Sequence, residues 1–103
     1  MKYQTTPAFD ADWRRLSEHE RDLFRRLVRV DFHAACERYR DDPSTPWPRG
    51  LRVRDVEGAQ GVWKMTWSFS GPDGRATFEW VTIDGVLAVR WRRIGGHGVF
   101  KQP

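Results

Sequence analysis

The C-terminal half of the chain alternates aromatic and basic residues with a period of two, and this pattern constrains the fold more than any other feature. Successive side chains of a β-strand point to opposite faces of the sheet. One predicted face is apolar and collects Trp63, Met65, Trp67, Phe78, Trp80, Leu87, Val89 and Trp91. The opposite, basic face collects Lys64, Thr66, Ser68, Arg75, Thr77, Glu79, Arg90 and Arg92. The apolar face predicts a core. The basic face predicts an anionic partner, because like charges on neighbouring strands repel each other until a partner neutralises them.

Turn residues divide this half into four predicted strands, over residues 51–57, 62–69, 75–83 and 86–94. The pair Asp84-Gly85 is typical of a two-residue hairpin loop. The cross-strand pairs that follow are Phe78 with Trp91, Thr77 with Arg92, and Glu79 with Arg90. For the preceding hairpin, a four-residue loop over residues 71–74 keeps aromatic residues facing each other, with Trp67 opposite Phe78. This half is therefore predicted to be an antiparallel meander.

The same alternation in the first of these strands places Leu51 and Val53 on the apolar face. The basic face then carries six cations, which are Arg52, Arg54, Lys64, Arg75, Arg90 and Arg92. Such a cluster either binds phosphate groups or forms a solvated edge.

The N-terminal half has the helical period of 3.6 residues after a short predicted strand over residues 2–6. A brief helix is predicted over residues 10–16. Ser17 and Glu20 form a capping box, which predicts a second helix over residues 18–40. Its buried face is expected to combine two apolar stripes, Leu23, Leu27, Val30 and Ala34 beside Phe24, Val28, Phe32, Ala35 and Tyr39. Residues 41–50 hold three prolines and predict a loop. Trp47 in this loop is expected to pack on the core, and stacking on a base is the alternative.

Length and charge limit the classes of protein to which the chain can belong. At 103 residues the sequence suits a single domain, residues 1–103. The net charge of +4 favours an acidic partner without identifying it. The single cysteine excludes an internal disulfide, and no apolar run reaches the roughly 18 to 20 residues of a membrane span. We therefore expect a cytoplasmic protein with no membrane partner. The three histidines and Cys36 show no metal-ligand spacing, so no cofactor is expected.

Three segments of the sequence carry a resemblance to a known family. They are LRVRDVEGAQGVWKMTWSF, GPDGRATFEW and the ending VRWRRIGGHGVF, and they follow a strand and a helix pair. Together they resemble the RelE/ParE superfamily of bacterial toxins from type II toxin-antitoxin modules, over nearly the whole chain. The resemblance implies an α+β fold with two N-terminal helices packed on one face of a twisted antiparallel β-sheet. Ribonuclease members of that superfamily bind mRNA in the ribosomal A site and cut it, whereas other members inhibit DNA gyrase.

The resemblance also implies roles for individual residues. Arg75 follows a tight turn and looks like the arginine that stabilises charge on the scissile phosphate. His97, in IGGHGVF, looks like the C-terminal histidine that acts as general acid or base. Phe100 lies where these enzymes often have a tyrosine, but it has no hydroxyl to transfer a proton. Lys64 matches a position that varies between basic and acidic residues.

Each of these assignments has a structural alternative. His97 is either a proton-transfer group or a polar residue of a glycine-rich tail. Arg75 is either a phosphate ligand or a solvent-facing strand residue. Glu79 is predicted to form a cross-strand ion pair with Arg90, and a role as general base is the alternative.

We therefore expect an endoribonuclease of the mRNA interferase type that works without a metal ion. Its catalytic residues would be His97 and Arg75, and its RNA-binding residues would be Arg52, Arg54, Lys64, Arg90 and Arg92. The implied partners are mRNA at the ribosome and a cognate antitoxin, an acidic protein that would cover the basic face. The alternatives are a ParE-like DNA gyrase inhibitor and a non-catalytic nucleic-acid or protein-binding module.

Overall fold

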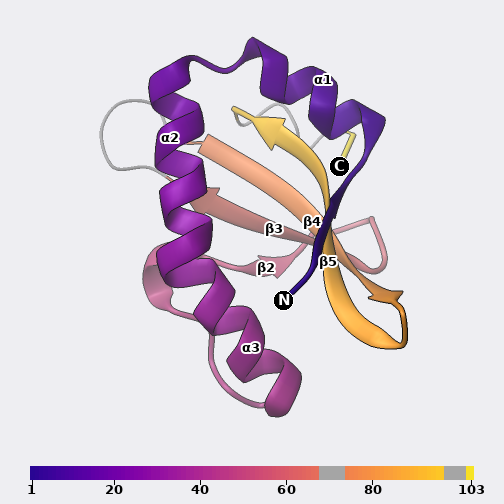
Figure 1. Ribbon diagram of the computed structural model, residues 1–103. Coiled ribbons are helices and arrows are strands. Elements are labelled where there is room, and N and C mark those ends of the chain that lie inside the picture. The colour runs from indigo at the N-terminus through magenta and orange to yellow at the C-terminus, as the bar shows by residue number, and fades with distance from the viewer. Residues whose placement is uncertain (68–73, 97–101) are drawn as a thin grey trace.

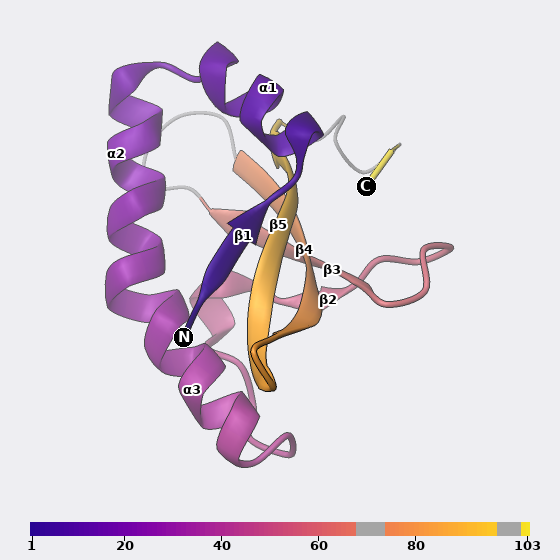
Figure 2. The ribbon, with the colours of Figure 1, turned by 45° about the vertical axis from the view of Figure 1, so that its right-hand side comes forward.

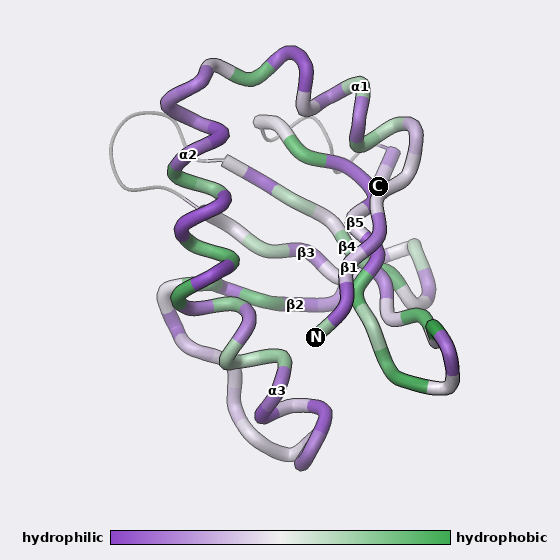
Figure 3. The backbone as a smooth tube through the Cα atoms, viewed as in Figure 1, coloured by the Kyte–Doolittle hydropathy of each residue, from purple (hydrophilic) through white to green (hydrophobic). Residues whose placement is uncertain are grey.

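The computed structural model describes residues 1–67, 74–96 and 102–103, which form an α+β fold (Figures 1 and 2). Its helical part is α1 followed by one long helix, α2–η1–α3, in which η1 is a π turn. The elements in chain order are β1 (Tyr3–Thr5), α1 (Pro7–Arg15), α2 (Glu18–Leu27), η1 (Val28–Phe32), α3 (His33–Asp41), the 3₁₀ turn η2 (Arg49–Leu51), β2 (Arg54–Asp55), β3 (Val62–Trp67), β4 (Gly74–Ile83) and β5 (Val86–Gly95). Figure 3 shows hydrophilic residues predominating along α2, interrupted by hydrophobic ones.

The strands form a five-stranded mixed sheet in the order β1-β5-β4-β3-β2. The pairs β2–β3, β3–β4 and β4–β5 are antiparallel, as the meander predicted. The expectation of a wholly antiparallel sheet is wrong, because β1 pairs with β5 in parallel. A parallel neighbour requires a long crossover, and here the whole helical part lies between β1 and the other strands.

The β4–β5 hairpin has the predicted pairs Phe78 with Trp91 and Glu79 with Arg90. The third predicted pair is wrong, because Thr77 lies opposite Arg93 and not Arg92. A β-bulge between Thr77 and Phe78 accounts for the difference, since a bulge sets two residues of one strand against one of its partner. Beyond the bulge, the alternation along β5 is shifted by one residue.

The β3–β4 register differs from the prediction by four residues, because Trp67 lies opposite Gly74 and not Phe78. A Cβ atom at Gly74 would overlap the indole ring of Trp67, so this ring packs directly on the glycine. A shift by an even number of residues keeps every side chain on its predicted face. The predicted loop over residues 71–74 falls largely on residues 68–73, which lie outside the described residues.

The helix α1 begins at Pro7 and not at the predicted residue 10. The Thr6 hydroxyl accepts a hydrogen bond from the Phe9 N–H at 3.1 Å, and proline suits the first helical position because it has no N–H to satisfy. The predicted capping box of Ser17 and Glu20 is confirmed, and α2 begins at Glu18 as expected. Both helix starts are therefore set by side-chain caps.

The long helix contains one extra residue, in the π turn η1, compared with a regular α-helix. The His33 N–H donates to the Val28 carbonyl, five residues earlier, which is the hydrogen bond of a π turn. Leu27 and Phe32 are consequently both buried at a spacing of five. The prediction that Val30 belongs to the buried stripe is wrong, since its side chain is 58% exposed.

Aromatic side chains fill the core between the helices and the sheet. Trp91 of β5 lies at its centre, with ring centroids 4.9 Å from Phe32, 5.1 Å from Phe24 and 5.5 Å from Phe78. Trp47 stacks on Phe32 at 6.1 Å and on Tyr39 at 5.2 Å, which confirms the prediction that it packs on the core. Figure 2 shows α2 and α3 together along one side of the sheet.

The helix α1 is attached to β5 by a buried carboxylate. Asp12 is 5% exposed and accepts hydrogen bonds from Arg93 Nε at 2.6 Å and from the Ile94 N–H at 3.1 Å. Burial acts to raise the pKa of Asp12, but the hydrogen bonds from Arg93 and Ile94 and the charges of Arg93 and Arg15 hold this pKa below its ordinary value. The carboxylate thus satisfies a backbone donor at the edge of β5, beyond the three residues that β1 covers.

We predict that Gly74→Ala lowers the free energy of unfolding by about 2–3 kcal/mol, because the new methyl group forces the Trp67 ring out of its packed position. Urea denaturation measures the change. Gly50→Ala is the control, since a Cβ atom there meets nothing within 4 Å. Equal stability of the two variants would contradict this account of the register.

We predict that Asp12→Asn lowers the free energy of unfolding by about 2–3 kcal/mol at pH 7, because it leaves Arg93 without its counter-charge. The folded pKa of Asp12 lies below its unfolded pKa of about 3.9, so the stabilisation is present above that pH and is lost as the pH falls through the folded pKa. Urea denaturation from pH 7 to pH 2.5 should therefore show the two proteins converging in acid. Asp22→Asn removes an exposed carboxylate and is expected to change stability by less than about 0.5 kcal/mol. A difference that persists unchanged in acid would exclude this origin.

Candidate functional site

The sheet face opposite the aromatic core gathers basic side chains from four strands. In one row across the sheet, Arg54 of β2 pairs with Lys64 of β3, Lys64 with Thr77 of β4, and Thr77 with Arg93 of β5. Arg75 lies in the next row, between Thr66 and Gly95. Like charges directly opposite each other on neighbouring strands repel, and Arg54 and Lys64 form such a pair.

Glu79 lies between two of the arginines on this face. Its Oε1 accepts a hydrogen bond from Arg90 Nη1 at 3.1 Å, which is the predicted ion pair, and its Oε2 accepts one from Arg92 Nη1 at 3.0 Å. Arg90 also donates to the amide oxygen of Gln4 on β1. Glu79 therefore fixes the positions of two guanidinium groups while neutralising only one of their charges.

Two donors on this face converge on a single oxygen atom. The Thr77 hydroxyl donates at 3.1 Å and Arg92 Nε at 2.9 Å to the main-chain oxygen of Pro103. Arg93 Nη1 donates to the neighbouring carbonyl of Gln102 at 3.1 Å. In Figure 2 the C-terminal end correspondingly lies on the side of the sheet away from α2 and α3. The convergence shows that this part of the face can present several hydrogen-bond donors to one acceptor group.

Arg75 is half-buried at the start of β4, where its Nη1 donates to the Gly74 carbonyl at 3.0 Å. The strand β5 ends at Gly95, which pairs with Arg75, and His97 is only two positions further in the sequence. His97 and Phe100 themselves lie outside the described residues.

The predicted site residue Arg52 is not on the strand. Its backbone has φ 48, a left-handed conformation that ends the 3₁₀ turn η2, and its side chain is exposed. The predicted strand over residues 51–57 is shortened to Arg54–Asp55. The prediction that Arg52 lies in a strand is therefore wrong, and alternation gives no face for its side chain because alternation holds only in extended backbone.

Sequence reasoning missed Arg93, which strict alternation assigns to the apolar face. The bulge at Arg92 returns Arg93 to the side of Thr77 and turns Ile94, which is 1% exposed, into the core. A signal for this bulge exists in the sequence. The apolar positions Val89 and Trp91 are two apart, but the next one, Ile94, follows after three.

The basic face does not extend over the whole sheet. Val62 of β3 and Ala88 of β5 lie on the same face by register, yet they are 6% and 0% exposed. Val56, in the connection between β2 and β3, is also buried. An apolar end thus confines the basic surface to the part of the sheet near Thr77.

The described parts of the chain contain no group of metal ligands and no helix that could span a membrane. Among residues 1–67, 74–96 and 102–103, no three or more histidine, cysteine, aspartate or glutamate side chains are grouped to hold a metal ion. In the same part of the chain, no helix has both the length and the apolar character needed to cross a bilayer. Comparison with known proteins found no matching family model, no matching curated protein and no matching solved structure.

We predict that Glu79→Gln strengthens binding of a polyanion about 2- to 5-fold at 0.1 M salt, because it removes the carboxylate that offsets Arg90 and Arg92. Isothermal titration with a defined heparin oligosaccharide measures the effect. Asp84→Asn makes the same charge change in the exposed β4–β5 turn and should leave the affinity within about 1.5-fold. Weaker binding by Glu79→Gln would mean that Glu79 is needed to hold the arginines in place.

Proposed function

We propose that this chain is the toxin of a type II toxin-antitoxin module and an mRNA-cleaving endoribonuclease of the RelE/ParE superfamily. The observation that carries the proposal is the basic face of Arg54, Lys64, Arg75, Arg90 and Arg92, on which Arg90 and Arg92 share the carboxylate of Glu79. The sequence resemblance supports the same conclusion independently of this geometry. The α+β fold supports the proposal only in its class, because β1 joins the sheet in parallel and the resemblance implies an antiparallel sheet.

The substrate class follows from the chemistry of the donors. Guanidinium groups bind phosphate through two parallel hydrogen bonds, and Glu79 holds Arg90 and Arg92 side by side. Thr77 adds a hydroxyl donor to the same acceptor position as Arg92. An RNA backbone supplies phosphate oxygens at regular intervals, so it can engage Arg54 and Lys64 in the same row.

Cleavage by the RNA 2′-hydroxyl requires a base, an acid and cations that stabilise the extra charge of the phosphorane. We assign the last role to Arg75, at the end of the basic face where β5 terminates. His97 is the proposed proton-transfer residue, because histidine is the side chain that ordinarily exchanges a proton near neutral pH. Glu79 is assigned to positioning arginines, because both of its oxygens are engaged by them.

A cognate antitoxin is the proposed protein partner. It would be acidic and would cover the basic face, which neutralises the same cations that bind RNA. The proposed site of action is the cytoplasm, on mRNA at the ribosome. Toxin and antitoxin would then compete for one surface.

We predict that induction of the wild-type chain in a bacterial host arrests growth and creates new transcript 5′ ends, and that Arg75→Ala and His97→Ala each reduce these ends about 100-fold or more. Mapping of transcript 5′ ends after induction measures both effects. Arg26→Ala, on the exposed side of α2, is the control and should retain full activity. All variants are first compared by circular dichroism to confirm folding.

The other outcomes separate the competing functions. Growth arrest without new transcript ends would overturn the ribonuclease proposal in favour of a gyrase-inhibiting toxin, which does not need His97. Unchanged growth and transcripts would overturn both toxin proposals and leave a nucleic-acid or protein-binding module, whose affinity falls with salt and with loss of the arginines.

A further inference from the structure

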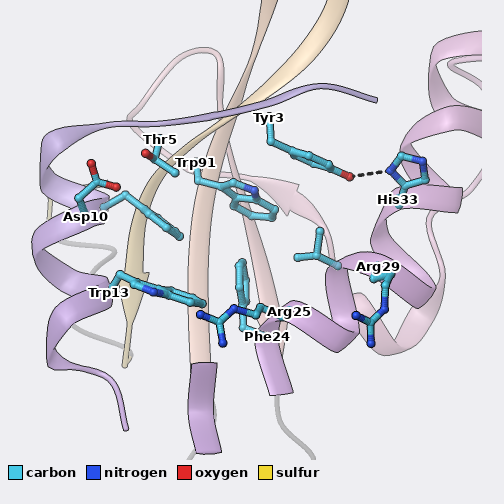
Figure 4. Close-up of a pocket in the computed structure, with 11 residues that line it drawn as sticks. Tyr3, Thr5, Asp10, Trp13, Phe24, Arg25, Arg29, His33 and Trp91 are labelled. Carbon is cyan, nitrogen blue, oxygen red and sulfur yellow. Dashed lines mark hydrogen bonds between the residues drawn. The ribbon is translucent and has the colours of Figure 1, made fainter. Parts of the chain in front are cut away.

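A pocket of about 580 Å³ lies on the opposite side of the sheet from the basic face, between β1, α1 and the long helix (Figure 4). This volume falls in the range of small-molecule sites, about 300–1,000 Å³. Aromatic side chains form most of its walls, and they are Tyr3, Phe9, Trp13, Phe24 and Trp91. The pocket is therefore separate from the surface assigned to RNA.

The aromatic walls are arranged in stacked pairs. Tyr3 and Trp91 stack at 6.5 Å with their planes 15° apart, and Phe9 and Trp13 stack at 5.9 Å with planes 19° apart. Flat rings with fixed orientations favour a flat apolar ligand, which can add to such stacks or meet them edge to face.

The polar groups of the pocket are unevenly distributed. Figure 4 shows Asp10 at the α1 end and Arg29 at the opposite end, near His33. Arg25 lies over the Trp13 ring at 5.2 Å and pairs with Asp22 outside the pocket lining. Among the described residues, Arg29 forms no ion pair and no side-chain hydrogen bond. Arg29 therefore brings a guanidinium group without an ion pair in the described residues to the end of the pocket away from α1.

His33 lines the pocket and is held by contacts with two other side chains. Its Nδ1 lies 3.1 Å from the Tyr3 hydroxyl, and its Nε2 lies 3.3 Å from Glu37 Oε1. Both ring nitrogens are therefore engaged within the protein. A ligand charge at this end would be met by Arg29.

The π turn shapes this wall. Val28 and Arg29 of η1 and His33 directly after it all line the pocket, while Phe32 remains fully buried in the core. The neighbouring positions 32 and 33 thus face the core and the pocket respectively. Single π turns inside α-helices are frequent at functional sites.

We propose that this pocket binds a small molecule with a flat aromatic body and one carboxylate. The aromatic body lies among Trp13, Phe24 and Trp91, and the carboxylate faces Arg29. This ligand class fits the volume, the stacked walls and the guanidinium group of Arg29, which is unpaired within the described part of the chain. The proposal does not depend on the function assigned to the basic face.

The experiment measures binding of three probes of one shape by isothermal titration: 2-naphthoate, the neutral 2-naphthamide and the cationic 2-naphthylmethylammonium. We expect 2-naphthoate to bind at least 10-fold more tightly than the cation and about 5-fold more tightly than the amide. Arg29→Gln should abolish the preference for the carboxylate without weakening the amide. Arg26→Gln removes a cation from the exposed side of the same helix and should leave all three affinities unchanged.

The position of the site is tested by filling it. Val28→Trp puts an indole into the pocket and should weaken 2-naphthoate more than 10-fold, whereas Val30→Trp, at a position 58% exposed and outside the lining, should not. Circular dichroism melting establishes that each variant is folded. Undetectable binding of 2-naphthoate, equal affinity for the three probes, or binding that survives Val28→Trp in a folded protein would each overturn the proposal.

Discussion

The packing of Trp91 is the interaction on which the rest of the structure depends. Its ring lies within 6.5 Å of the rings of five other aromatic residues, which are Tyr3, Phe9, Phe24, Phe32 and Phe78. These residues come from β1, α1, α2, η1 and β4, so one side chain contacts nearly every layer of the molecule. Large rings bury much apolar area per residue, which a chain of 103 residues needs because a small domain buries a smaller share of its surface.

Two local irregularities, each of one extra residue, decide what the regular elements around Trp91 present to solvent. The bulge at Arg92 keeps Trp91 and Ile94 in the core and places consecutive arginines on the basic face. The π turn keeps Leu27 and Phe32 in the core and directs His33 to the pocket wall. In both places the extra residue changes which side chains lie on the surface, while the apolar residues on either side of it stay buried.

The same irregularities mark the limit of what the sequence could predict. Periodicity correctly separates the helical half from the meander, and the capping box and Asp84-Gly85 locate a helix start and a hairpin, because these signals are local. Periodicity fails at Val30 and Arg93, where tertiary packing favours an extra residue over regular geometry. The pairing of Trp67 with Gly74 could not be predicted from residues near either one in the sequence, because it depends on how the indole ring packs on the neighbouring strand. Of the candidate site, Arg54, Lys64, Arg75, Arg90 and Arg92 lie on strands as predicted, Arg52 does not, and His97 stays a prediction.

Charged side chains are arranged differently on the helices and on the basic face of the sheet. On the helices, some arginines pair with a carboxylate one turn away, as in Arg25 with Asp22 at 3.0 Å and Arg40 with Glu37. Such pairs let a helix carry many charges at little electrostatic cost. On the sheet, Arg90 and Arg92 share Glu79, and Arg54 lies directly opposite Lys64. A polyanionic ligand of the kind proposed above would supply phosphate groups to Arg90 and Arg92, two guanidinium groups that share one carboxylate within the protein.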